Sequence, residues 1–241
     1  MLSVTGASST LPRHSTLDRA AGAAPNFLPS YVQPDIAEAR AFEERLRYAE
    51  NHGSFLALTV KPSLYDAARE EITRRFATRP LDLERVFVTA LRHAADAVGA
   101  DWAVVVNADA ADQRSEHWRN LNHLIASRVI PQVEQAMIHN SASGQSVLSY
   151  NLNWLERYDQ VVMLSRVAQA VQDGRVHGVW LLIPASPQTE MPLLDGAAVP
   201  VITANQWAYI PESWCQNLHR ADTKRNGSSH AAEAASPMEG K

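Results

Sequence analysis

The stretch FLALTV at residues 55–60 decides the fold class, because it is short, continuous and apolar at every position except Thr59. A run of this length without polar alternation is typical of an interior strand of a parallel sheet, which is buried on both faces. Pro62 follows almost at once and closes the strand. The sequence around this run therefore predicts an α/β fold.

Helical patterns alternate with apolar runs along most of the chain. The spacing predicts helices over residues 35–52, 63–76, 82–91, 118–139 (with a kink at Pro131), 152–171 and 211–220. It predicts further strands at residues 102–106, 146–150 and 179–183, and a short edge strand at 199–202. Strands separated by helices imply right-handed crossovers. We therefore expect a three-layer, Rossmann-like fold, with a mostly parallel sheet of about four or five strands and helices on both faces.

Both ends of the chain depart from this pattern. Residues 1–34 and 221–241 are rich in Ser, Ala, Gly and Pro, and they bury too little apolar surface to offset the entropy of ordering them. We expect a disordered N-terminal tail at 1–34, a single α/β domain at 35–220 and a disordered C-terminal tail at 221–241.

Bulk composition excludes several classes of protein. The formal net charge of −4 argues against binding nucleic acid through overall charge, although 22 Lys and Arg leave room for a local basic face. Cys215 is the single cysteine, so an intrachain disulfide is excluded and a reducing compartment is indicated. No apolar run approaches the ~18 residues of a membrane span. We expect a cytoplasmic protein that does not associate with membranes.

No complete catalytic motif occurs in the sequence. Lys61-Pro62-Ser63 follows the first strand, where a nucleotide hydrolase would carry a glycine-rich phosphate loop. Rossmann glycines, the H-R-D and D-F-G signatures of kinases and the G-x-S-x-G elbow of hydrolases are also missing. The sequence thus argues against an enzyme without excluding one.

The carboxyl ends of the expected strands are the natural place for a ligand in such a sheet. The polar residues at these ends are candidate ligand-binding residues: Lys61, Asn107, Asp109, Asp112 and Asn151. A carboxylate after an apolar strand can hold Mg²⁺ with a nucleotide, so a degenerate or partner-completed nucleotide-binding domain is one alternative. The other interpretation is an acidic loop that caps the next helix.

Two further constellations have plainer interpretations. His117 and His123 are six residues apart, about 120° around a helix, so we expect solvated side chains and no metal site. The helix arginines, among them Arg74, Arg75, Arg114 and Arg119, are interleaved with glutamates as on ordinary solvated faces. A nucleic-acid adaptor that uses these arginines remains a weaker alternative.

The C-terminal region carries three aromatic residues spaced by polar residues, Trp207, Tyr209 and Trp214. Tryptophan and tyrosine dominate interaction hot spots, which makes these residues candidates for an exposed docking surface. A lid packed on the edge of the sheet is the alternative interpretation.

Several stretches together carry a family resemblance: residues 55–60, 101–105, 118–121, 155–159, 180–184 and 194–201. The set resembles the C-terminal region of very large bacterial proteins of BREX (phage-growth-limitation) bacteriophage-exclusion systems, most closely the serine/threonine kinase component. It covers about residues 36–220. The resemblance implies an accessory domain, because the kinase activity of that family belongs to a domain without a counterpart here.

These observations favour a non-catalytic interaction or regulatory module associated with phage defence. The expected partner is another protein, such as a defence-system kinase or ATPase, and no cofactor is expected. Mg²⁺ with a nucleotide is expected as a cofactor only under the nucleotide-binding alternative.

Overall fold

The computed structural model describes residues 33–141, 144–186, 189 and 191–220. The tails expected at 1–34 and 221–241 lie outside the described residues, except for Gln33 and Pro34. No helix in the described part is both long enough and apolar enough to cross a membrane.

The centre of the fold is a sheet of five parallel strands in the order β2-β3-β4-β1-β7. Their bounds are β1 Phe55–Val60, β2 Thr78–Asp82, β3 Ser146–Tyr150, β4 Gly178–Pro184 and β7 Trp207–Tyr209. The expected parallel α/β architecture is therefore confirmed, and the strands at 55–60, 146–150 and 179–183 are confirmed with it. A two-stranded antiparallel ribbon, β5 (Leu193–Leu194) with β6 (Ala197–Ala198), lies outside this sheet.

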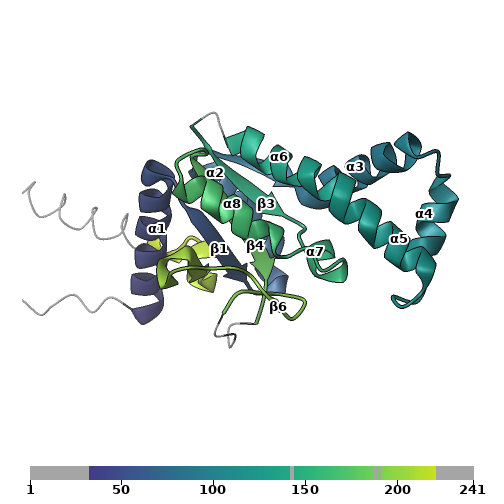
Figure 1. The fold of residues 1–241 in the computed structure, drawn as a ribbon. Coiled ribbons are helices and arrows are strands. Elements are labelled where there is room, and N and C mark those ends of the chain that lie inside the picture. Colours follow the sequence, from purple (N-terminus) through teal and green to yellow (C-terminus); the bar gives the residue numbers. More distant parts are fainter. Residues whose placement is uncertain (1–32, 142–143, 187–188, 190, 221–241) are drawn as a thin grey trace, which may run out of the picture. The chain divides into compact units, whose positions relative to one another are not determined.

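Helices cover both faces of the sheet (Figure 1). Side chains alternate along β1 between two cores, with Phe55 and Ala57 in one and Leu56 and Leu58 in the other. The first core is shared with α3 (Leu83–Ala97), α6 (Ile130–Ser141) and α8 (Met163–Gln172). The second is shared with α1 (Pro34–His52), α2 (Tyr65–Arg75) and α9 (Glu212–Cys215). The three-layer prediction is confirmed.

The strand expected at residues 102–106 is wrong, because residues Trp102–Asp109 form helix α4. Asp101 is its N-cap, and its side chain accepts a hydrogen bond from the backbone N–H of Ala103. Only Val105 and Ala108 of this helix are buried. A short apolar run does not distinguish a strand from a helix, and here the capping residue decided in favour of the helix.

The two edge strands of the sheet were not predicted. β2 contains Arg79 and Pro80, which are exposed, and its other residues are only partly buried, so it lacks the apolar pattern of an interior strand. The edge strand expected at 199–202 is wrong, since the edge is formed by β7 a few residues later. The last helix, expected over 211–220, is the shorter α9.

Two long helices of the prediction are interrupted in the structure. Residues 118–139 comprise α5 (Glu116–Leu124), a π-helical turn η2 (Ile125–Val129) and α6. The π-helical turn directly precedes Pro131, which has no N–H for the regular ladder. Residues 152–171 comprise α7 (Trp154–Arg157) and α8, and Asp159 has a positive φ of 55° between them.

Candidate functional site

The predicted ligand residues are not gathered in one place. Lys61 and Asn151 follow β1 and β3, so both lie at the carboxyl edge of the sheet as expected. Asn107 and Asp109 lie on α4, and Asp112 lies in the turn after it. These three residues were expected at the sheet edge because residues 102–106 were predicted to be a strand. Since residues 102–109 form a helix, that expectation is wrong.

The loop after β1 offers little to a phosphate. Pro62 has no N–H, and it begins the one-turn 3₁₀ helix η1 (Pro62–Leu64). The Lys61 ammonium lies 3.3 Å from the Glu212 carboxylate. Beside them, the N–H of Ala185 donates to the carbonyl of Val60 at 2.8 Å and extends the pairing of β1 with β4. The loop therefore lacks the array of free N–H groups that cradles phosphates.

Asn151 is occupied by contacts within the fold. Its backbone N–H donates to the Tyr65 hydroxyl at 3.0 Å, and its side-chain amide donates to Asp82 at 3.2 Å. Its φ is 59°, a left-handed conformation that asparagine tolerates well. These contacts join β3 to α2 and β2. They border a cavity of about 340 Å³, which is also lined by Glu84, Asn153, Trp154 and Pro184.

Asp109 forms an ion pair between α4 and α7. One of its carboxylate oxygens accepts hydrogen bonds from the Arg157 guanidinium at 2.9 and 3.0 Å and from the Tyr158 hydroxyl at 2.7 Å. Burial and the Asp109 carboxylate together raise the pKa of Tyr158 to about 12. Asp112 accepts a hydrogen bond from the N–H of Arg114 at 2.7 Å within the loop, and the cap of the next helix, α5, is Ser115.

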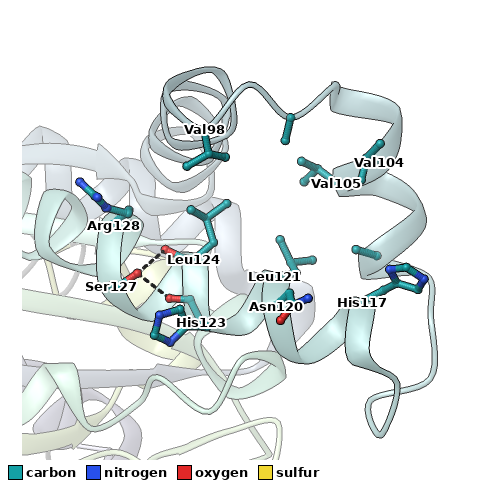
Figure 2. Close-up of a pocket in the computed structure, with 12 residues that line it drawn as sticks. Val98, Val104, Val105, His117, Asn120, Leu121, His123, Leu124, Ser127 and Arg128 are labelled. Atoms are coloured by element: carbon teal, nitrogen blue, oxygen red, sulfur yellow. Dashed lines mark hydrogen bonds between the residues drawn. The ribbon is translucent and has the colours of Figure 1, made fainter.

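An apolar groove of about 610 Å³ lies between the end of α3, α4 and the α5–η2 segment. Figure 2 shows Val98, Val105, Leu121 and Leu124 pointing into it from these elements. The lining residues are Val98, Ala100, Val104, Val105, Ala108, His117, Asn120, Leu121, His123, Leu124, Ser127 and Arg128. Val98 and Val104 are each 57% exposed, an unusual exposure for aliphatic side chains that share one groove.

The polar groups of the groove lie around its rim. In Figure 2, Arg128 is at one end and His117 is at the other. The hydroxyl of Ser127, in the π-helical turn, donates to the carbonyl of His123 in α5 at 2.7 Å. This hydroxyl therefore already has a hydrogen-bond partner within the fold. From their spacing, we expected His117 and His123 to be solvated side chains without a further role. The structure places both at this groove, which becomes visible only once residues 102–109 are recognised as a helix.

Contacts at both ends of α4 fix one wall of the groove. At its start, the Arg92 guanidinium from α3 lies 4.4 Å from the centre of the Trp102 ring. At its end is the pair of Asp109 with Arg157. Behind α5, Trp118 stacks on Tyr158 at 6.4 Å between ring centroids. These contacts within the fold position α4 and α5 on either side of the groove.

The three C-terminal aromatic residues belong to the sheet and its cover. Trp207 and Tyr209 lie in β7 beside β1, and the Trp207 indole N–H donates to the Thr59 hydroxyl at 3.0 Å. Trp214 is fully buried in the second core. Of the two interpretations, a cover packed on the edge of the sheet fits these positions. Trp214 has no exposed surface to offer a partner.

A buried carboxylate, Glu43, joins α1 to α2 and the C-terminal segment, and the sequence analysis did not identify it. It pairs with Arg47 at 2.8 Å, Arg75 at 3.0 Å and Arg220 at 2.6 Å. His219 and the Trp214 indole N–H also contact it, at 2.8 and 3.1 Å. Burial alone would raise the pKa of Glu43, but hydrogen bonds from Arg220, His219 and Arg47 outweigh it and hold that pKa well below its usual range. This cluster stabilises the fold.

Within the described ranges, no group of three or more His, Cys, Asp or Glu side chains is arranged to hold a metal ion. The groove, with apolar walls and a polar rim, is the candidate functional site.

No protein-family model matches the chain, and no solved structure matches it. The chain is 28% identical over 193 residues to the probable kinase PglW of Streptomyces coelicolor. The match covers 78% of this chain and 12% of that protein. The chain is thus related to the kinase component of BREX systems, as its sequence pattern indicated, and it spans a small part of that component's length.

Proposed function

We propose that this chain is a non-catalytic interaction module of a bacterial phage-defence system, and that it binds a protein partner through the α3–α4–α5 groove. The observation that carries the proposal is the groove itself, an open apolar cavity of about 610 Å³. Apolar surface left open to water is costly, and covering it with a partner recovers that free energy. The relation to a kinase component supports the link to phage defence.

The polar groups at the carboxyl edge of the sheet support a non-catalytic role. Lys61 is paired with Glu212, and Asn151 is bonded to Asp82 and Tyr65. A nucleotide at this edge would have to displace these contacts without a phosphate cradle to replace them. The nucleotide-binding alternative therefore has less support than the docking role.

Co-purification with the proteins encoded beside this chain tests the proposal. Val104→Glu places a charge in the groove, and Val162→Glu makes the same change at a valine outside it. The exposures are comparable, 57% and 63%. We expect the wild type and Val162→Glu to retain a BREX kinase or ATPase component and Val104→Glu to lose it. Retention by Val104→Glu, or no complex with the wild type, would contradict the proposal.

A further inference from the structure

We infer that the occupant of the groove is an amphipathic helix that presents an acidic residue to Arg128. The inference rests on the proposed docking role and specifies the chemistry of the partner. Two properties of the groove carry it: the hydrogen bonding of its walls and the charge of its rim.

The walls of the groove exclude an extended peptide. Its lining residues belong to helices α4 and α5, the π-helical turn η2 and the turn after α3. The backbone groups of helices bond to one another, so these walls offer no open strand edge for β-augmentation. An extended segment would bury its own N–H and C=O groups without partners, at a cost of about 1–3 kcal/mol each. A helix bonds these groups internally and can enter an apolar groove.

The charge of the rim selects an acidic partner. The lining contains one arginine and two histidines, and it contains no carboxylate. Within the described residues, Arg128 lies in no ion pair, whereas Arg157, Arg166 and Arg175 each pair with a carboxylate.

The carboxylates on α4 and in the turns beside it have hydrogen-bond or ion-pair partners other than Arg128. Asp101 accepts from the N–H of Ala103, Asp112 accepts from the N–H of Arg114, and Asp109 is paired with Arg157. A glutamate or aspartate on an incoming helix is therefore the complementary group for Arg128.

Synthetic peptides test the chemistry without a known partner. The probe is an end-blocked alanine-based peptide of about 18 residues, long enough to be helical, with leucines along one face and glutamates at the edge of that face. A second peptide has lysine in place of glutamate, and a third has proline at its centre. Fluorescence anisotropy of the labelled peptides, titrated with the whole chain, gives the affinities.

The expected result is tighter binding of the glutamate peptide than of the lysine peptide, by about two- to fivefold, which is the scale of exposed charge pairs. Arg128→Glu should reverse that order. Arg119→Glu is the matched control, because it reverses a charge on α5 outside the lining and should leave the order unchanged. The proline peptide should lose binding.

Equal affinity for the two charged peptides, an unchanged order in Arg128→Glu, or full binding of the proline peptide would overturn the inference. Absence of binding by every peptide would overturn it too, while the co-purification experiment still decides the docking role separately. If the chain is a dimer that Val104→Glu converts to a monomer, a second copy covers the groove and the inference fails.

Discussion

Arg157 donates two hydrogen bonds, from Nε and one Nη, to the same carboxylate oxygen of Asp109. The second nitrogen also donates to the Asp109 carbonyl at 2.9 Å, so the end of α4 is held by both side chain and backbone. A residue that the sequence suggested as a Mg²⁺ ligand thus positions one wall of the groove.

Loss of the Asp109 carboxylate should loosen α4. Asp109→Ala removes a partly exposed ion pair and the acceptor of the half-buried Tyr158 hydroxyl, so the free energy of unfolding should fall by about 1–2 kcal/mol. Urea unfolding measures the change. Asp96→Ala, at an exposed carboxylate on α3, should have an effect near zero. Equal stability of the two variants would show that Asp109 does not support α4.

Mg²⁺ with ATP should leave the melting temperature unchanged at millimolar concentration. The loop after β1 lacks a phosphate cradle, and Lys61 is already paired with Glu212. A ligand that binds the native state must raise the melting temperature, so a thermal-shift series in ATP and GTP measures the outcome directly. A concentration-dependent rise would revive the nucleotide-binding alternative.

Glu43→Gln should be strongly destabilising. The change removes a buried charge and leaves three arginines and a histidine without their shared partner, which typically costs about 3–5 kcal/mol. Glu44→Gln is the matched control, since Glu44 is the exposed neighbour on the same helix. Denaturant unfolding of both variants gives the difference. A small effect at Glu43 would mean that the cluster is dispensable.

Glu43 should also make the free energy of unfolding depend on pH. Because the folded state holds the pKa of this carboxyl well below its ordinary 4.5, the ionised form stabilises the fold, and that contribution is present above about pH 4.5. It is lost as the pH falls below that value. The stability of the wild type should therefore fall more steeply on acidification than that of Glu43→Gln, as unfolding curves between pH 3 and pH 7 would show. Parallel curves would contradict this.

Cys215 should react slowly with iodoacetamide while the chain is folded. Burial raises the pKa of its thiol to about 11, and the thiolate is the reactive species. The rate at pH 8 should rise to that of a free thiol in denaturant, as mass spectrometry over time would show. Fast labelling of the native chain would contradict the buried position in the second core.

The sequence predicted those parts of the fold in which burial requires a recognisable pattern of apolar residues. The strands at 55–60, 146–150 and 179–183 are confirmed. The first and third are nearly continuous apolar runs, because both faces of an interior parallel strand are buried. The sequence did not predict the strand that contains Arg79 and Pro80, because an edge strand needs few apolar residues. The valines at 104–106 were misread as a strand, since a short apolar run is ambiguous by itself.

That misreading also hid the candidate site. The groove requires α4 to be a helix packed beside α3 and α5, and periodicity in one sequence does not reveal which helices leave a gap between them. Arg128 and Val104 belong to different elements, and they line the same groove only in the folded chain. The predicted ligand residues Lys61 and Asn151 did reach the sheet edge, where the order of parallel strands places them.

The most direct test of the groove is hydrogen exchange of the chain alone and in complex with its co-purified partner. The account predicts slower exchange for backbone amides in α4, α5 and the π-helical turn, with β7 and the loop after β1 unchanged. Protection confined to β7 or to the carboxyl edge of the sheet, with α4 and α5 exchanging as in the free chain, would contradict it.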